Sequence, residues 1–304
     1  MDRRDFVKGA LGALGVFTLA QPAHALPLST VKLGIINSEI CDDFEESLQF
    51  IKSYNLNWVE VKNLWGKPNT LQDADTVKKA KGLVDKYNLK VSLLATGIFK
   101  QVLPPKGPER DELLKKQHAE LQTAIRNARI FETDRIRVFA FTVQDPSKRI
   151  WDDAMEELEK AVRIAEAEGV SLAVENIFEN HVETGADVER MLHDIPSPRL
   201  GVIWEANNAA MAGDFSPLNG LLRVDVKRIL DVHLRDGRHN ADGKFEWCAV
   251  GEGEIDDAGI IKHLLDNGYT GPLTLETHYT PPNGTKTDGS RMSIEGLLKI
   301  IETL

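Results

Sequence analysis

A regular alternation of short apolar runs with longer stretches of helical period constrains the fold of this chain more than any other feature of its sequence. The apolar runs are rich in β-branched residues, and eight of them predict strands over Val31–Ile36, Trp58–Val61, Lys90–Leu94, Arg135–Phe141, Ser171–Glu175, Leu200–Trp204, Ile229–Leu234 and Leu273–Glu276. The stretches between them predict helices over Phe44–Tyr54, Ala74–Tyr87, Pro108–Phe131, Trp151–Glu168, Ala186–Leu192, Pro217–Lys227, Asp256–Asn267 and Ser293–Glu302. Gly169 and Gly268 follow two of these stretches, where a glycine commonly ends a helix.

Repeated strand–helix units predict parallel strands that are joined by right-handed crossovers. Eight such units in about 275 residues fit a closed (β/α)8 barrel with the helices outside. The competing architecture, an open doubly wound sheet, usually carries a glycine-rich phosphate loop after its first strand, but residues 37–42 contain no glycine. No linker or low-complexity segment divides the chain, so we expect an α/β fold with a single (β/α)8 barrel over residues 26–304.

The first 25 residues contain the three regions of an export signal in order. A basic start with Arg3, Arg4 and Lys8 precedes an apolar run of about 12 residues, which is shorter than the roughly 20 residues of a membrane span. Ala-His-Ala at residues 23–25 resembles a cleavage site, and the arginine pair resembles a twin-arginine signal. We therefore expect residues 1–25 to be a signal peptide for the twin-arginine export machinery, and the mature protein to be periplasmic or secreted, without a stable membrane anchor.

The composition excludes several classes of protein. Hydrophobic residues make up 42% and charged residues 28% of the 304 residues, which differs from disordered, collagen-like and polytopic membrane proteins. The formal net charge of −10 gives the chain no attraction to phosphate backbones, so we expect no nucleic-acid partner. Cys41 and Cys248 are too few for a disulfide scaffold or a structural zinc cluster, and the sequence leaves their pairing open.

Polar side chains follow the apolar part of each of the last four predicted strands. Functional residues of a (β/α)8 barrel gather at the carboxyl ends of its strands, so we expect these side chains to meet there. Carboxylates that meet in this way repel one another and lose hydration, and a divalent cation compensates for both effects. An oxygen-rich set with one imidazole suits Mn²⁺, Mg²⁺ or Co²⁺, and Zn²⁺ also accepts such ligands. The predicted ligands of one divalent metal ion are Glu175, Glu205, His233 and Glu276.

Further residues near the predicted strand ends are candidates for contact with a substrate. Arg235 lies two residues after His233 and faces the same side if the strand continues, where its charge suits a hydroxyl, carboxylate or phosphate group. His181 lies in the loop after the fifth strand and is expected to reach the substrate. Glu60 and Trp65 lie at the end of the second strand, and Trp65 is expected either to stack on a sugar ring or to pack within the protein.

Six segments in a fixed order resemble the xylose isomerase-like TIM barrels, in the sugar phosphate isomerase and epimerase branch. The segments are Arg137–Phe139, Leu172–Asn176, Gly201–Asn208, Val232–Asp236, Gly251–Asp256 and Leu273–Glu276, and the resemblance extends over about residues 31–303. It implies the same four metal ligands, with one departure. Glu205 stands where the family usually has aspartate, and its extra methylene moves the carboxylate outward by about 1.5 Å, which leaves its ligand role open. Asn208 stands where members often have His or Asn, so it is expected to contact the substrate or to support the ligands.

The resemblance implies chemistry on a carbohydrate with the help of the metal. In this family the metal holds a carbonyl and a neighbouring hydroxyl oxygen, and its charge stabilises an enediolate as a proton leaves the adjacent carbon. Glu175 and Glu276 are expected to exchange that proton as base and acid. We therefore expect a sugar isomerase or epimerase, and the export signal favours an unphosphorylated sugar or keto-sugar as its substrate.

Three other functions compete with this expectation. A lyase or hydratase would use the same chemistry for β-elimination on an oxidised sugar or glycoside. A sugar-binding barrel without catalysis would explain the change to Glu205. A DNA-repair endonuclease with a multi-zinc cluster is disfavoured, because the strand ends supply mainly His233 as an imidazole ligand. The sequence leaves the oligomeric state open.

Overall fold

The computed structural model describes residues 31–214 and 216–304. The predicted signal peptide, residues 1–25, therefore lies outside the described part of the chain, and its prediction stays untested. Among the helices of the described part, none combines the length and the apolar character of a membrane span.

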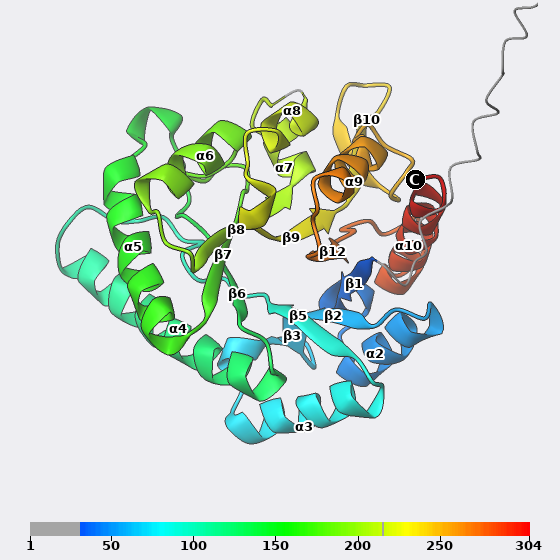
Figure 1. Cartoon of the computed structure of the whole chain (residues 1–304), viewed down its shortest axis with the longest axis horizontal. Coiled ribbons are helices and arrows are strands. Elements are labelled where there is room, and N and C mark those ends of the chain that lie inside the picture. Colours follow the sequence, from blue (N-terminus) through cyan, green and yellow to red (C-terminus); the bar gives the residue numbers. More distant parts are fainter. Residues whose placement is uncertain (1–30, 215) are drawn as a thin grey trace, which may run out of the picture.

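Eight parallel strands close into a barrel, and helices surround it on the outside (Figure 1). Neighbouring strands pair in the order β1, β12, β9, β8, β7, β6, β5 and β2, and β2 pairs with β1 to close the circle. The barrel strands are β1 (Lys32–Ile36), β2 (Trp58–Val61), β5 (Lys90–Leu94), β6 (Arg135–Val138), β7 (Ser171–Glu175), β8 (Leu200–Glu205), β9 (Ile229–Leu234) and β12 (Pro272–Leu275). This arrangement confirms the predicted (β/α)8 barrel.

The outer layer consists of long helices between the strands and a few short ones at the strand ends. The α-helices are α1 (Asn37–Ile40), α2 (Phe44–Ser53), α3 (Ala74–Lys86), α4 (Pro108–Phe131), α5 (Trp151–Glu168), α6 (Gly185–Asp194), α7 (Ala206–Met211), α8 (Pro217–Leu221), α9 (Asp257–Asp266) and α10 (Lys286–Glu302). Short 3-10 helices lie at Asn69–Leu71, Pro146–Lys148 and Val226–Arg228. The buried faces of the long helices pack on the apolar outer face of the barrel.

Three predicted boundaries were wrong by three residues or more, each for a local reason. The helix predicted over Pro217–Lys227 ends at Leu221, and Asp225 caps a separate 3-10 helix by accepting a hydrogen bond from the amide of Lys227. Helix α10 begins at Lys286 rather than at Ser293, because Thr285 and Asp288 form a capping box there. The strand predicted to reach Phe141 ends at Val138, and the amides of the following residues bond to carbonyls of the loop after β5.

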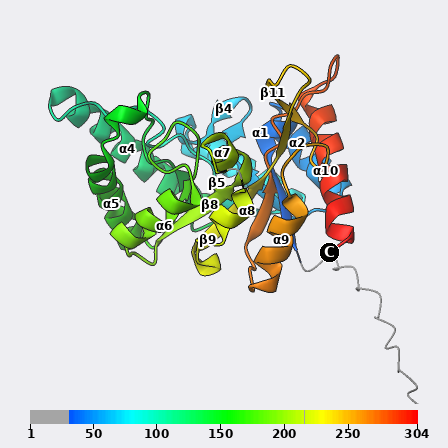
Figure 2. The ribbon, with the colours of Figure 1, turned by 90° about the horizontal axis from the view of Figure 1, so that it is seen from above.

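Two hairpins that the sequence analysis did not predict extend the carboxyl end of the barrel. Strands β3 (Asn63–Leu64) and β4 (Lys67–Pro68) form one hairpin, and β10 (Asp236–His239) and β11 (Phe245–Cys248) form the other. Figure 2 shows both hairpins on the same side of the molecule. The longer hairpin directly follows β9, so it lies beside the predicted site.

The alternation of side chains along each strand decides which residues enter the barrel. Leu93, Ala173 and Ile203 form a small apolar cluster of their own inside it, separate from the main core between strands and helices. Positions two residues further along these strands face the same interior near its carboxyl end. Glu175 and Glu205 stand in this relation to Ala173 and Ile203, so the pleat itself aims their carboxylates into the barrel.

Candidate functional site

Seven charged or titratable side chains converge in the carboxyl half of the barrel interior. None of them is more than 4% exposed, and they are Glu60, Arg137, Glu175, Glu205, His233, Arg235 and Glu276. They come from β2, β6, β7, β8 and β9 and from the residues that follow β9 and β12. Charges this deep need partners, because burial without compensation costs several kcal/mol for each ion.

Glu175, His233 and Glu276 form a group in which one ligand atom of each residue lies within 4.8 Å of the others. Nδ1 of His233 is 3.2 Å from Oε2 of Glu276 and 3.8 Å from Oε2 of Glu175. His233 Nδ1 and Glu276 Oε2 are both buried, and neither has a hydrogen-bond partner among the described residues. Buried polar atoms rarely stay unpaired. Two carboxylates and an imidazole with such free atoms fit a divalent cation.

Glu60 fixes the orientation of the His233 ring. Its Oε2 lies 2.9 Å from Nε2 of His233, so Nε2 donates to the carboxylate and Nδ1 faces Glu175 and Glu276. Burial opposes a positive charge on His233, but the carboxylates of Glu60 and Glu276 raise the pKa of this imidazole well above its usual range. The sequence analysis placed Glu60 among the substrate contacts. At 0% exposure it instead lies behind His233, as carboxylates commonly do behind metal-binding histidines.

Arg137 supplies a fixed positive charge at the centre of the group. Its Nη1 lies 2.9 Å from Oε2 of Glu175, 3.6 Å from Oε1 of Glu276 and 3.9 Å from Oε1 of Glu60. Arg137 belongs to one of the segments that resemble the family, and no role was predicted for it. The signal that could have found it is a charged residue between the apolar Ile136 and Val138, in a short strand that the sequence already predicts.

Glu276 is held in its charged form. Burial acts to raise its pKa, but the charges of His233 and Arg235, with a hydrogen bond from His278, hold the pKa well below its usual range. In the described structure a carboxylate at this position therefore accepts protons only weakly. A cation that takes the place of His233 or Arg235 beside Glu276 would change the pKa of this carboxyl.

Glu205, the fourth predicted ligand, lies outside this group. Its carboxylate accepts hydrogen bonds from the backbone amides of Asn207 and Asn208 at the start of α7. The same carboxylate accepts from Nη2 of Arg235 at 2.9 Å. The extra methylene that distinguishes Glu205 from aspartate thus carries the carboxylate into a helix cap and an ion pair. The structure brings three of the four predicted ligands together and not the fourth.

Arg235 is fastened from several sides. Its Nη2 donates to Oδ1 of Asn208 at 2.8 Å as well as to Glu205, and its Nη1 donates to Nδ1 of His278 at 2.8 Å. Its guanidinium lies 4.4 Å from the ring centroid of Trp247 on β11. Asn208 is 3% exposed and donates to the carbonyl of Asn176. Of the two roles expected for Asn208, the geometry matches support of the site.

A second group of possible ligands consists of Glu39, Glu276 and His278. Nε2 of His278 lies 3.6 Å from Oε1 of Glu276 and 3.8 Å from Oε1 of Glu39. Because Nδ1 of His278 accepts a hydrogen bond from Arg235, the neutral ring carries its proton on Nε2. A protonated nitrogen has no lone pair for a metal, so with this tautomer Nε2–H is suited to donate a hydrogen bond rather than to bind an ion.

Trp65 and His181, two predicted substrate contacts, lie away from the buried group. Trp65 packs against Phe44 of α2 with 5.7 Å between ring centroids, and Nζ of Lys79 lies 4.8 Å from its ring centroid, so packing is the role that the structure favours. His181 is 2% exposed, its Nδ1 donates to backbone carbonyls, and its Nε2 accepts from the amide of Ile150.

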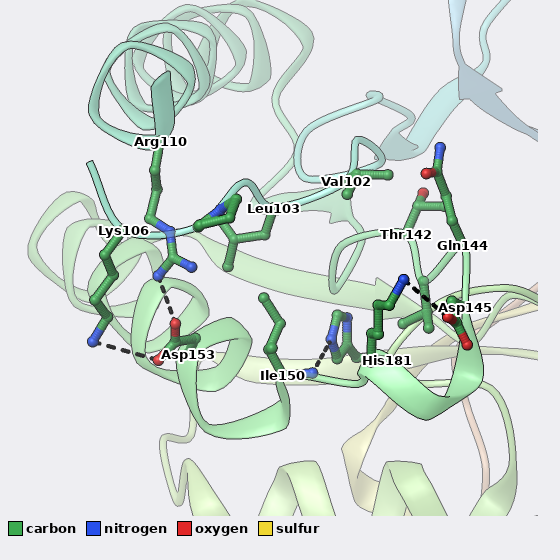
Figure 3. A pocket seen from close by; sticks show the side chains of 13 residues that line it. Val102, Leu103, Lys106, Arg110, Thr142, Gln144, Asp145, Ile150, Asp153 and His181 are labelled. Carbon is green, nitrogen blue, oxygen red and sulfur yellow. Dashed lines mark hydrogen bonds and ion pairs between the residues drawn. The ribbon is translucent and has the colours of Figure 1, made fainter. Parts of the chain in front are cut away.

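His181 lines a separate cavity of about 510 Å³ (Figure 3). The loops after β5 and β6 form most of its wall, and none of the seven buried charged residues lines it. Arg110 and Lys106 at its rim both pair with Asp153. The substrate contact predicted for His181 would therefore involve this cavity and not the predicted metal ligands.

Asp236 connects the barrel to the β10–β11 hairpin. Its carboxylate accepts hydrogen bonds from the backbone amides of Gly237, Gly251, Gly253 and Ile255. A Cβ atom at Gly253 would lie 2.0 Å from the carboxylate, so only glycine fits there. Phe245 and Trp247 of β11 stack edge to face, and Trp247 also meets His278 in this way.

The chain resembles several enzymes in sequence, over parts of their length. It is 32% identical to 3-dehydroshikimate dehydratase of Pseudomonas putida over 102 residues, which are 32% of this chain and 16% of the relative. It is 23% identical to inosose dehydratase of Geobacillus kaustophilus over 177 residues, which are 54% of this chain and 57% of the relative. The chain thus spans less than two thirds of each of these relatives.

Solved structures share the fold at low sequence identity. An IolI protein with a bound zinc atom superposes with a TM-score of 0.71 at 15% identity, covering 89% of this chain and 98% of that one. L-ribulose 3-epimerase gives a TM-score of 0.70 at 16% identity, with 90% and 95% covered. A protein from Mycobacterium smegmatis in complex with magnesium gives 0.65 at 14% identity, with 90% and 97% covered.

A family model matches most of the chain. It is the one described as Xylose isomerase-like TIM barrel, and it covers residues 48–299. This range contains β2 to β12, and with them all six barrel strands that supply or precede the buried charged residues and all seven of those residues. The chain belongs to the xylose isomerase-like TIM barrel family.

Proposed function

We propose that this protein is a divalent-metal-dependent sugar isomerase or epimerase that acts through an enediolate on an unphosphorylated sugar or keto-sugar. The observation that carries the proposal is the pair of unpartnered buried atoms, His233 Nδ1 and Glu276 Oε2, which face each other at 3.2 Å beside Glu175. Membership of a family that contains epimerases and dehydratases supports an enzymatic role.

Glu175, His233 and Glu276 are the residues that would hold the metal. Mn²⁺, Mg²⁺ and Co²⁺ suit this donor set, and Zn²⁺ is compatible with it; the zinc and magnesium of two structural neighbours support this range. A divalent ion bound here would act as a Lewis acid that makes the carbon next to a carbonyl group more acidic.

The protein side chains then move the proton. Glu175 and Glu276 come from β7 and from the end of β12, which two other strands, β8 and β9, separate in the barrel. A carboxylate oxygen of each lies within 4.8 Å of the other, so both can reach one carbon of a bound sugar, where one removes a proton and the other returns it. Arg137 holds Glu175 at 2.9 Å and thereby fixes the direction of its Oε2. Arg235, anchored by Glu205 and Asn208, supplies a positive charge above the pair.

A second candidate is a lyase or dehydratase that uses the same proton removal and then expels an oxygen substituent. His278 favours it, because its Nε2–H lies near Glu276 and its side chain is 35% exposed, which suits a hydrogen-bond donor to a departing hydroxyl or alkoxide. The dehydratases among the relatives support the same reading. A sugar-binding barrel without catalysis is the remaining alternative.

The test is metal content by mass spectrometry on the protein and on the double variant Glu175→Gln, Glu276→Gln. We expect about one divalent ion per chain in the protein and loss of it in the variant. The control is Glu205→Gln, which removes an equally buried carboxylate outside the group and should retain the ion. If neither the unchanged protein nor the double variant takes up metal, even when metal is added, the proposal fails. A sugar-binding barrel without catalysis then becomes the better explanation.

Incubation of the metal-loaded protein with keto-sugars in deuterium oxide distinguishes the reactions. Deuterium on the carbon next to the carbonyl in an epimer or isomer supports the first candidate. An unsaturated or dehydrated product supports the second.

We propose further that the protein acts after export, as the arginine pair at residues 3 and 4 suggests. Fractionation of the producing cell, with and without an Arg3→Lys, Arg4→Lys variant, tests this location. Retention of the variant in the cytoplasm, with the unchanged protein outside it, is the expected result.

A further inference from the structure

One lysine beside the site has a positive charge that no described residue neutralises. Lys100 lies in the loop after β5, and its ammonium forms no hydrogen bond and no ion pair within 4.0 Å among residues 31–214 and 216–304. Its contact is with the ring of Phe139, 4.8 Å from Nζ to the centroid. By contrast, Lys106 in the same loop pairs with Asp153 at 3.4 Å (Figure 3).

The backbone around Lys100 is fixed, so the fold determines where this side chain begins. The amide of Lys100 bonds to the carbonyl of Gly97 at 3.1 Å, and its own carbonyl accepts from the hydroxyl of Thr142. The preceding Phe99 is buried with a φ of 61°, and its amide donates to Oε1 of Gln117 at 2.7 Å. A non-glycine residue in the left-handed region is held there by such surroundings.

Lys100 lies near enough to the carboxylates that the proposed function uses for their charges to act on it. Burial, the largest influence, lowers the pKa of its ammonium, while the charges of Glu175 and Glu276 act in the opposite direction. Arg137, which is bonded to Glu175, lies 5.3 Å from the centroid of the same Phe139 ring. Lys100 is nevertheless exposed in part, so a small molecule can reach it.

The order of the strands places Lys100 opposite Arg235 at the mouth of the barrel, which is the opening at the carboxyl ends of the strands. Lys100 follows β5 and Arg235 follows β9, and these strands are separated by three others in either direction around the circle. Arg235 already has Glu205, Asn208 and His278 as partners. A substrate that spans the mouth thus meets Arg235, whose charge already has partners, at one end. At the other end it meets Lys100, whose charge has no partner among the described residues.

The balance of charges at the mouth also favours an anionic substrate. Five carboxylates face four cationic side chains and the protonated His233, which balances the charges in the metal-free protein; the residues are Glu39, Glu60, Glu175, Glu205 and Glu276, with Lys62, Lys100, Arg137 and Arg235. A bound divalent ion, which displaces the proton of His233, turns this into one positive charge. A single anionic group on the substrate restores neutrality.

We propose that Lys100 binds a carboxylate of the substrate, so that the substrate is an acidic sugar derivative. The proposal rests on the proposed function for the reaction and adds the class of its substrate. A carboxylate fits better than a phosphate, because a phosphate dianion is usually bound by an arginine fork or several backbone amides, and Lys100 offers one point charge.

The test compares matched ligands by calorimetry on the metal-loaded protein. D-glucuronate and D-glucose differ in a carboxylate at one carbon, and glucose 6-phosphate offers a phosphate there. We expect glucuronate to bind more tightly than glucose, and Lys100→Met to weaken glucuronate by about tenfold to a hundredfold while glucose changes by less than about twofold. Lys100→Arg, which keeps the charge, and Lys106→Met, the control in the same loop, should both retain the preference.

Several outcomes overturn the proposal. A preference for glucuronate that survives in Lys100→Met would show that another residue binds the carboxylate. A Lys100-dependent preference for glucose 6-phosphate, without one for glucuronate, would assign the site to phosphate. Equal affinity for all three ligands would show that Lys100 forms no anion site.

A measurement that needs no metal separates this proposal from the proposed function. Acylation of Lys100 at about pH 8, followed by mass spectrometry, is expected to slow when glucuronate is present and not when glucose is present. Protection in a protein that takes up no metal would support the lysine site while the proposed reaction fails. Metal uptake without any protection of Lys100 would leave the reaction intact and overturn the lysine site.

Discussion

His233 and Glu60 are 173 positions apart in the chain, yet Nε2 of the first lies 2.9 Å from Oε2 of the second at zero exposure of both side chains. The bond determines which nitrogen of the ring remains available. With Nε2 engaged, Nδ1 faces Glu276 and Glu175, where it has no partner. The hydrogen bond between Nε2 and Glu60 therefore determines that Nδ1 is the ring nitrogen that faces Glu175 and Glu276.

Replacing Glu60 by glutamine tests this relationship. Glutamine keeps an oxygen for Nε2 but loses the charge that orients the ring and strengthens it as a ligand, so metal affinity should fall by about tenfold to a hundredfold. Competition with a chelator measures it. Glu39→Gln is the control, because Glu39 lies near the mouth but outside the buried group. Unchanged affinity in Glu60→Gln would contradict the orienting role.

Metal uptake should depend on pH in a defined direction. The raised pKa of His233 means that its imidazole holds a proton at neutral pH in the metal-free protein. A metal ion requires the neutral ring, so binding releases about one proton and affinity rises as pH increases, by about tenfold per pH unit below that pKa. Calorimetry in buffers of different ionisation enthalpy counts the released protons. Affinity that stays constant between about pH 5.5 and 7.5 would argue against His233 as a ligand.

Arg137→Met should make the protein depend on metal for its stability. Without the guanidinium, Glu60, Glu175 and Glu276 lose a shared counter-charge, which should lower the free energy of unfolding by about 3–5 kcal/mol in the presence of a chelator. Added divalent metal should restore more stability to the variant than to the unchanged protein. Thermal unfolding with chelator and with metal measures both effects. Arg129→Met, which breaks the exposed pair with Glu168, is the control and should change little.

Asp231→Asn should raise stability at neutral pH. Burial and the charge of Glu60 raise the pKa of Asp231 to about 8, while its usual value is 3.8. A carboxyl with a raised folded-state pKa favours folding only while it is protonated, so the unchanged protein loses stability as pH rises from about 4 to about 8. Asparagine removes this loss and can still accept the hydrogen bonds of Thr274 and Val232.

The expected gain of Asp231→Asn is about 2–4 kcal/mol at pH 8 relative to pH 4. Urea unfolding at both pH values measures it. A difference between the two proteins that does not change with pH would mean that Asp231 is ionised in the folded state.

The sequence was sufficient for the barrel, because strand and helix signals are local. Apolar β-branched runs and caps determined most boundaries, and Pro108–Phe131 and Trp151–Glu168 are helices over the predicted range. The same locality explains why Glu175, His233 and Glu276 could be predicted, since each lies at or near a strand end. The helix predicted over Pro217–Lys227 failed where a local cap at Asp225, weak in the sequence, started a new turn.

The partners of these residues depend on contacts across the barrel, which no local pattern encodes. Glu60 and Arg137 are charged residues in short strands, and only barrel closure brings them to His233 and Glu175. For Glu205 the position was predicted, but its contacts were not. Its place at a strand end was predicted, but the direction of its carboxylate follows from the amides of α7 and from Arg235.

The four amide hydrogen bonds to Asp236 have a consequence for how such a chain can diversify. They close a ring of backbone from Gly237 to Ile255, so the ends of the β10–β11 hairpin are tied to the barrel independently of what the hairpin contains. Insertions and exchanges between His239 and Phe245 are expected to alter the wall beside the mouth without moving the seven buried charged residues of the barrel. In evolution or in the laboratory, a new substrate is therefore reached more readily by recombining this hairpin than by remaking the barrel.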